Sequence, residues 1–277
     1  AKVRAHPRNP GHLTEADLAS YQPRRRDPLC HDHQSGPRGL RICGFPPPGS
    51  GAIAIAQILG ILAHSSAQSL ALQEGRPGAD WLHLYTEAAR LAFADRAQYI
   101  ADPDFATPPA ERWDSLLAPD YLAARARLIG ARSLKTAAPG QPGDRQARFA
   151  PMPEQLEIGT SHLSIVDAFG NALAMTTTIE DAFGSRQMVG GFLLNNQLTD
   201  FSFEPSRADG LPIANRVEPG KRPRSSMSPT LVFDAASGQL LMSLGSPGGA
   251  QIIHYTAKAL YAMLHWDLRP QQAVALP

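Results

Sequence analysis

The sequence lacks several features that would direct its function toward a charged polymer or a membrane. Its 26 basic and 25 acidic side chains nearly cancel, which leaves a formal net charge of +1 at pH 7. This balance gives no electrostatic reason to expect binding to nucleic acid or to an anionic membrane surface. No run of 18 apolar residues occurs, so the sequence predicts no membrane insertion.

Cysteine is also scarce, because Cys30 and Cys43 are the two in the chain. Two short strands around the polar segment 31–42 would bring them within disulfide reach and favour an oxidising compartment; two separate thiols are the alternative. His31 and His33 in "CHDH" suggest a metal site locally. No second Cys/His cluster completes a tetrahedral set, so we expect polar turn residues there and no metal.

The first half of the chain carries helical patterns, within a composition that is 43% hydrophobic and sufficient for a core. Residues 13–21 are typical of a short helix that Thr14 caps. Residues 52–64 are almost wholly apolar and predict a buried helix, with Ser50 as a candidate cap. Residues 80–100 repeat apolar side chains at helical spacing, so a third helix is predicted there.

The composition changes over residues 135–157, which hold four prolines and two glycines. This pattern predicts an exposed flexible connector, and an interdomain linker is its simplest interpretation. Alternating segments then predict hairpins over 162–179 and 230–245, followed by a helix over 250–266. Helices, antiparallel hairpins and a final helix together indicate a layered α+β fold with sheets inside.

Thr160 follows Gly159 directly after this connector. If the bond between them breaks, Thr160 gains a free α-amino group, whose pKa of roughly 8 suits a general base for its own hydroxyl nucleophile. Glycine before the nucleophile lets the hydroxyl approach the preceding carbonyl without a Cβ in the way. On local sequence alone, an ordinary Gly-Thr pair entering a strand is the simpler interpretation.

Further polar clusters in the second half fit the same chemistry. The segment 245–249, "GSPGG", precedes a predicted helix, where adjacent backbone N–H groups can hold a developing oxyanion or simply form a tight turn. Ser225 and Ser226 can bind a carboxylate or cap a turn. Gln197 and Asp200 can hold a substrate ammonium group or be ordinary polar loop residues.

Several segments in the right order carry a resemblance to a known family. They are "GTSHLSIVDAFGNALAMTTTIEDAFGS" (159–185), "LLNNQLTDFS" (193–202), "PGKRPRSSMSPT" (219–230) and "LGSPGGA" (244–250). They resemble the successive motifs of the γ-glutamyltranspeptidase family, also called glutathione hydrolases. The first half agrees, because three segments resemble that family's large subunit: 13–21, 41–59 and 87–105. The ordered set is specific and covers nearly the whole chain, whereas a lone "GTSH" would be weak.

The resemblance implies an α+β fold, the N-terminal-nucleophile hydrolase sandwich, in which two stacked antiparallel sheets lie between helical layers. It implies a precursor that cuts itself between Gly159 and Thr160. Residues 1–159 would then be the C-terminal part of the large subunit, and 160–277 the N-terminal part of the small, catalytic subunit. The two parts would form one folded unit.

The resemblance also assigns roles to single residues. Thr160 is the implied nucleophile and new N-terminus, and the hydroxyl of Thr178 would support it. Gly248 and Gly249 match the glycines of the oxyanion hole. The remaining matches concern the γ-glutamyl group: its α-amino group would be held by Glu180, Gln197 and Asp200, and its α-carboxylate by Ser225 and Ser226. Glu180 stands where some members have Asn.

The implied activity is γ-glutamyl transfer or hydrolysis, with glutathione or a related compound as donor and water, an amino acid or a peptide as acceptor. No cofactor is needed, and the implied location is periplasmic or secreted. A cephalosporin (glutaryl) acylase of the same fold is the alternative, which the ammonium-binding set disfavours. A binder of γ-glutamyl peptides that is never processed is a remote third hypothesis.

The chain departs from the family in length. It has no match to the N-terminal motif whose arginine clamps the substrate carboxylate, and neither Arg186 nor Arg224 is equivalent to that arginine. It begins without Met and without an apolar leader segment, and it ends inside what reads as a structural element. We therefore expect an internal fragment of a longer protein, inactive on its own.

Overall fold

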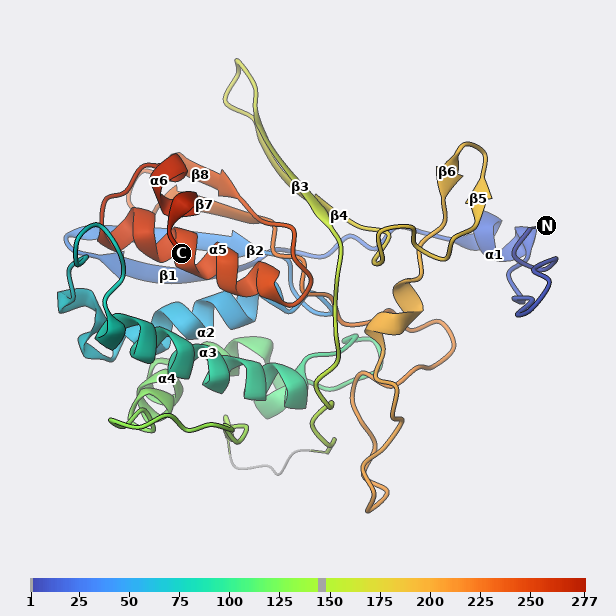
Figure 1. The fold of residues 1–277 in the computed structure, drawn as a ribbon, viewed down its shortest axis with the longest axis horizontal. Helices are drawn as coiled ribbons and strands as arrows, with labels where there is room; N and C mark the ends of the chain where they lie inside the picture. Colours follow the sequence, from blue (N-terminus) through green and yellow to red (C-terminus); the bar gives the residue numbers. More distant parts are fainter. Residues whose placement is uncertain (1, 144–147) are drawn as a thin grey trace.

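The computed structural model describes residues 2–143 and 148–277, which form an α+β arrangement of helices and antiparallel strands (Figure 1). The first half contains α1 (Glu15–Ser20), β1 (Leu29–Ser35), β2 (Arg38–Gly44), α2 (Gly51–Ala63), α3 (Ala79–Tyr99) and α4 (Pro119–Ala126). The second half contains β3 (Ser161–Val166), β4 (Ala172–Thr177), β5 (Met188–Val189), β6 (Phe192–Leu193), β7 (Thr230–Asp234), β8 (Leu240–Leu244), α5 (Gln251–His265) and α6 (Pro270–Ala275). The predicted fold class is confirmed.

The largest sheet is antiparallel, with the strand order β1-β2-β7-β8. Its first two strands place Cys30 directly opposite Cys43, with Cα atoms 4.0 Å apart, and a disulfide joins them. The interpretation of His31 and His33 as turn residues is wrong. Both lie within β1, because strand pairing continues to Ser35, and alternation points them to the face that the helices cover.

The core lies beneath this sheet. The side chains of Leu40, Ile42 and Val232, at most 2% exposed, pack against α2 and α5, and α3 lies behind α2. An apolar helix in that position is buried on nearly all sides, as its composition predicts. The expected cap at Ser50 is wrong in one respect. The Ser50 hydroxyl makes no capping bond and instead donates to the carbonyl oxygen of Ser225 at 2.7 Å.

A buried carboxylate on α3, Asp95, joins several elements. One carboxylate oxygen accepts from the backbone N–H of Gly140 at 2.7 Å and lies 3.1 Å from the Arg125 guanidinium of α4. The other accepts from the Gln57 amide of α2 at 2.8 Å and from the Tyr121 hydroxyl at 2.7 Å. These bonds fix α2, α3, α4 and the start of the proposed connector to one another.

The connector predicted over 135–157 is exposed at most of its described positions but is anchored to the body at a few buried ones; residues 144–147 lie outside the described part. Ala150 is fully buried and bridges to Ile213, and the Met152 N–H donates to the carbonyl oxygen of Ala97 at 2.9 Å. The chain is therefore held to α3 before it reaches Thr160. The reason is that apolar side chains occur at alternate positions within a proline-rich segment.

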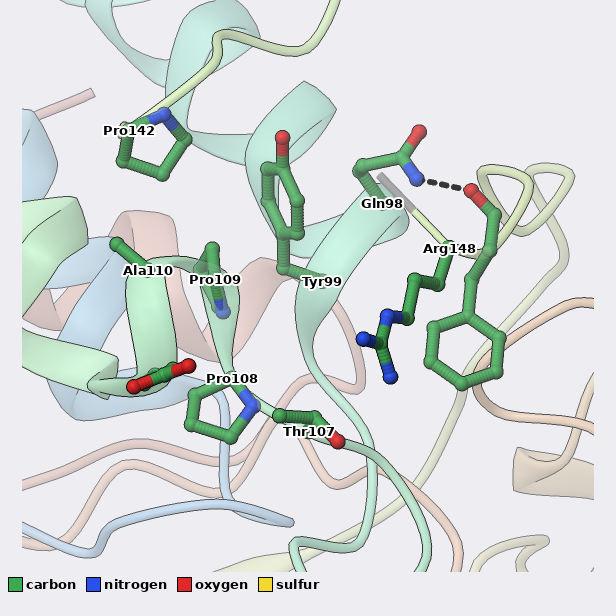
Figure 2. A pocket seen from close by; sticks show the side chains of 10 residues that line it. Gln98, Tyr99, Thr107, Pro108, Pro109, Ala110, Pro142 and Arg148 are labelled. Carbon is green, nitrogen blue, oxygen red and sulfur yellow. Dashed lines mark hydrogen bonds between the residues drawn. The ribbon is translucent and has the colours of Figure 1, made fainter. Parts of the chain in front are cut away.

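A cavity of about 60 Å³ opens where this segment passes the C-terminal end of α3 (Figure 2). Figure 2 shows the ring of Tyr99 and the side chain of Arg148 beside it, and the Gln98 amide donating to the carbonyl oxygen of Phe149. The residues that line this cavity are not among those that the sequence assigned to a site. Part of its lining comes from the connector, through Pro142, Arg148 and Phe149.

The β3–β4 hairpin projects from the body in Figure 1, and the predicted hairpin there is confirmed. Both of its strands contact β8: the Ser164 hydroxyl of β3 donates to the carbonyl oxygen of Ser243 at 3.0 Å, and the Ser243 hydroxyl donates to the carbonyl oxygen of Leu173 in β4 at 3.1 Å. These bonds place the residue before β3, Thr160, near the segment that links β8 to α5. Within the described ranges, no helix is both long and apolar enough to cross a membrane.

Candidate active site

The Gly159–Thr160 junction has an unusual backbone. Gly159 has φ +92° and Thr160 has φ +100°, a region that a β-branched residue rarely adopts. A Cβ added to Gly159 would lie 1.7 Å from the backbone oxygen of Glu180, so no larger residue fits there without movement. Glycine is therefore required at this position by close approach as well as by its dihedral angle.

The carbonyl oxygen of Gly159 faces two backbone donors. The N–H of Gly248 donates to it at 3.2 Å and the N–H of Gly249 at 3.4 Å, immediately before α5 begins. Both glycines have positive φ, +128° and +56°, which turns consecutive N–H groups toward one point. The two glycines that the sequence assigned to an oxyanion hole thus meet the carbonyl of the bond assigned to cleavage.

The strand register brings Thr178 close to Thr160. Ser161 pairs with Thr177 at the end of the β3–β4 hairpin, so Thr160 and Thr178 are the next residues on the two strands. Both line one small cavity. The Thr178 hydroxyl accepts from the N–H of Glu180 at 2.8 Å, which fixes the turn that follows β4.

That cavity has a volume of about 20 Å³, enough for a water molecule but not for an amino acid. It nevertheless gathers residues from five separate parts of the sequence. The sequence-predicted residues among its lining are Thr160, Thr178, Glu180, Gln197, Asp200, Ser225, Ser226 and Gly249. Gly159 and Gly248 are the chain neighbours of the lining residues Thr160 and Gly249, and the hydrogen bond described above joins them to each other.

One side of the cavity carries the acidic group. The Glu180 side chain accepts from the amide of Asn196, and Gln197 donates from its amide to Asp200 within the short turn Gln197–Asp200. Burial raises the pKa of Asp200 to about 6, although the bond from Gln197 opposes the shift. The negative charges of Glu180 and Glu157 add to the rise.

Two serines from another segment also line the cavity. The Ser225 hydroxyl accepts from the N–H of Met227 at 3.2 Å, and the Ser226 hydroxyl donates to the carboxylate of Glu157. Arg96, from α3, reaches this carboxylate at 3.0 Å and also donates to Ser226. A carboxylate is therefore already bound where the sequence predicted a carboxylate site.

The described ranges contain no group of three or more His, Cys, Asp or Glu side chains that could hold a metal ion. The chemistry that these residues can perform is acyl transfer. A threonine hydroxyl such as that of Thr160 can serve as a nucleophile, and a pair of backbone N–H groups can hold an oxyanion.

The family model described as Gamma-glutamyltranspeptidase matches residues 2–277. The chain belongs to the γ-glutamyltranspeptidase family. It is 36% identical over 276 residues to the glutathione hydrolase proenzyme of Escherichia coli K12, covering 98% of this chain and 44% of that protein. It is 33% identical over 271 residues to the acylase ACY 1 proenzyme of Pseudomonas sp. SE83, covering 97% of this chain and 43% of that protein.

A solved structure agrees with this membership. The cephalosporin acylase from Bacillus halodurans superimposes with a TM-score of 0.74 at 25% identity, covering 95% of this chain and 42% of that one. The predicted N-terminal-nucleophile hydrolase fold is confirmed. The chain spans less than half the length of the γ-glutamyltranspeptidase-family relatives that it matches.

Sequence reasoning missed four residues of this γ-glutamyltranspeptidase-family site. Asn196 lies in a recognised motif but received no role. Arg96 is a charged residue on the buried stripe of α3, and that position was the signal that could have revealed it. Arg224 was considered and set aside, and Glu157 was treated as part of a linker. Both lie beside Arg96.

Proposed function

We propose that the protein containing this chain is a γ-glutamyl transferase and hydrolase that matures by cutting its own Gly159–Thr160 bond. One observation carries the proposal. The Gly159 carbonyl oxygen accepts from the N–H groups of Gly248 and Gly249, the arrangement that stabilises an oxyanion at that carbon. Family membership agrees with it.

In maturation, the Thr160 hydroxyl oxygen attacks the carbonyl carbon of Gly159. The resulting oxyanion is held by the glycine pair, and the C–N bond then breaks, so that the amide becomes an ester. The hydroxyl proton passes to the Thr160 nitrogen, which leaves as an amine. Water hydrolyses the ester and yields a Gly159 carboxylate and a free Thr160 with both hydroxyl and amine. The positive φ at Thr160 supports this route, since cleavage relieves that backbone conformation.

In turnover, the free amine of Thr160 takes the proton of its own hydroxyl, and the oxygen attacks the γ-amide of glutathione or a related donor. The tetrahedral oxyanion occupies the place that the Gly159 carbonyl oxygen holds in the uncut chain. The amine product leaves with the proton and a γ-glutamyl ester remains on Thr160. Water then releases glutamate, or an amino acid or peptide amine takes the γ-glutamyl group.

We assign the substrate-binding roles by the chemistry of the side chains that line the cavity. The oxygen atoms of Glu180, Gln197 and Asp200 are suited to a substrate ammonium group, and the hydroxyls of Ser225 and Ser226 to its carboxylate. Thr178 positions the nucleophile across the hairpin. At about 20 Å³ the cavity is too small for a glutamyl group, so residues 157–159 must leave it before substrate enters.

Residues 1–159 and 160–277 are proposed as parts of the two subunits of one precursor, which remain packed after the cut. The disulfide between Cys30 and Cys43 supports a periplasmic or secreted location. No cofactor takes part in the proposed reaction. The remote hypothesis of an unprocessed binder has no comparable support, because a binder has no need of the glycine pair.

A cephalosporin (glutaryl) acylase is the second candidate. The likeness to the Bacillus halodurans acylase and to acylase ACY 1 favours it. The difference between the candidates is the substrate ammonium group, which a glutaryl amide lacks. Comparing kcat/KM for γ-glutamyl-p-nitroanilide and glutaryl-p-nitroanilide distinguishes them, and neutralising Asp200 by Asp200→Asn should harm only the first.

The test of maturation is an intact mass and N-terminal sequence of the full-length protein. We expect two pieces, the second beginning Thr-Ser-His-Leu, and one uncut chain for Thr160→Ala. Ser161→Ala is the matched control, because it removes the neighbouring hydroxyl from an exposed residue and should leave cleavage intact. An uncut wild-type chain, or a Thr160→Ala chain cut at the same bond, contradicts the proposal.

A further inference from the structure

Glu157 lies three residues before the proposed nucleophile, and its side chain is only 11% exposed. It lines the small cavity that contains Thr160. It also lines a second cavity of about 510 Å³, whose wall includes Arg96, Arg224 and His254. Glu157 thus stands between the nucleophile and a space large enough for a small-molecule ligand.

The carboxylate of Glu157 is bound as a ligand would be. Its oxygens lie 3.0 and 3.3 Å from Nη2 of Arg96, and one lies 3.5 Å from Nη2 of Arg224. It also accepts from the hydroxyl of Ser226. Burial alone would raise the pKa of Glu157, but the charges of Arg96 and Arg224 outweigh it and hold this pKa below its usual value.

Arg224 has binding capacity beyond this contact. Its side chain is 5% exposed, and its Nε and Nη1 groups find no hydrogen-bond partner among the described residues. Leaving the donors of a buried guanidinium unmatched is costly, so an arginine in that state points to an anion with more acceptors than Glu157 presents. Arg96 already has the hydroxyls of Ser50 and Ser226.

We propose that Arg96, Arg224 and Ser226 form the binding site for a carboxylate of the substrate, and that Glu157 occupies this site as an internal ligand until the chain is cut. The inference rests on the proposed function, since it gives a new cationic part and a built-in occupant to that same site. Arg224 is a specificity-determining residue, because its positive charge strengthens the binding of a substrate that carries a carboxylate at this site.

Cleavage removes one of the restraints that hold Glu157 in this site. In the uncut chain Glu157 is held from both sides, by the connector before it and by Gly159 after it. After the cut, Gly159 carries a new carboxylate beside the acidic side chains of Glu180 and Asp200. Repulsion between these like charges favours withdrawal of residues 157–159, and the carboxylate of a free ligand takes the vacated site.

The test uses binding, so that it does not depend on turnover. In full-length protein made uncleavable by Thr160→Ala, calorimetry measures the Kd of acetate, a carboxylate small enough to reach Arg96 and Arg224 from the cavity of about 510 Å³ while the segment before Thr160 stays in place. We expect Glu157→Gln to lower this Kd by about tenfold or more relative to the Thr160→Ala parent, because a neutral amide competes poorly for two guanidinium groups. The control is Glu204→Gln, which neutralises an exposed carboxylate outside the lining of both cavities and should leave Kd unchanged.

Adding Arg224→Met to the Glu157→Gln protein should abolish this gain, while acetamide, the neutral probe of the same size, should bind weakly throughout. Melting curves establish that each variant is folded. An unchanged Kd in Glu157→Gln, or a gain that survives Arg224→Met in folded protein, overturns the proposal. A protein that binds as expected but whose wild type is never cut would refute the proposed maturation alone, so the two failures are distinguishable.

Discussion

The backbone N–H of Gly248 lies 3.2 Å from the carbonyl oxygen of Gly159 and donates to it. The donor comes from the segment before α5 and the acceptor from the segment before β3. These segments meet because the β3–β4 hairpin lies against β8, which leads directly into the glycine pair. The proposed self-cleavage therefore needs no large rearrangement to form its oxyanion hole.

Gly249→Ala should slow self-cleavage by about a hundredfold or more, because the side chain forces the backbone N–H away from the Gly159 oxygen. This is the usual effect of losing one oxyanion donor. Gly249 has φ +56°, and an added Cβ would lie 1.9 Å from the carbonyl oxygen of Glu157. Gly238→Ala is the control, since Gly238 has φ +71° and open space around it. The measurement is the uncut fraction on a denaturing gel over time. Equal cleavage rates in the two variants would disprove the assignment of the pair.

Asp95→Ala should destabilise the folded protein by about 3–5 kcal/mol, because it leaves the buried Arg125 guanidinium without its carboxylate. The matched control is Asp114→Ala, which breaks the solvent-exposed pair with Arg112 and should change stability far less. Urea unfolding followed by circular dichroism measures both. Similar midpoints for the two variants would show that the Asp95 network contributes little.

Acidification from pH 6.5 toward pH 4 should destabilise the fold. Burial lowers the pKa of His31, His33 and His254 to about 4, so the unfolded chain binds more protons than the folded one throughout this interval. Stability present above pH 6.5 is then lost as the pH falls. Burial raises the pKa of Asp200 to about 6 and also raises the pKa of Asp95, and these two carboxyl groups act in the opposite direction. Burial lowers the pKa of His162 and His265, which act with the three histidines, so the histidines should dominate.

Melting temperatures between pH 7 and pH 4.5 test this balance. His254→Gln should make the dependence of Tm on pH shallower, because one of the three buried imidazoles no longer titrates. His64→Gln changes an exposed histidine and should leave the slope as it is. A Tm that rises on acidification would mean that the carboxyl groups dominate.

Reducing the disulfide should lower stability by about 2–4 kcal/mol, since Cys30 and Cys43 close a loop with a sequence separation of 13. The double variant Cys30→Ser, Cys43→Ser should have the same Tm as the wild type in dithiothreitol. Reductant should have no effect on that variant, which makes it the control for the reductant itself. An unchanged wild-type Tm in dithiothreitol would contradict a stabilising disulfide.

Local patterns in the sequence predicted the helices and strands well, because the spacing of apolar side chains and the residues that favour turns depend on neighbouring positions only. The hairpin from Ser161 to Thr177 and the buried helix beginning at Gly51 follow from alternation and from an apolar run. The site residues were also nominated in advance, through the motifs that contain them, and the cavity at Thr160 gathers most of them.

What the sequence did not reveal is long-range pairing of charges. Arg96, Glu157 and Arg224 are each separated from the next by more than 60 residues along the chain, and neither Glu157 nor Arg224 stands out within its own segment. Only the packing of α3 against the two later segments makes them neighbours. His33 was misplaced for a similar reason, because strand pairing with β2 decides its burial.

The bond between the Gly159 oxygen and the glycine pair has a practical consequence for anyone who redesigns the pocket. Under the proposed maturation, the Thr160 hydroxyl and the glycine pair act first on the chain's own Gly159–Thr160 bond, so the cleavage of each full-length variant reports on those groups during production. A library can therefore be sorted by the number of bands on a gel, before any substrate is synthesised. Variants that remain a single band can be discarded, and only those that divide in two need an assay.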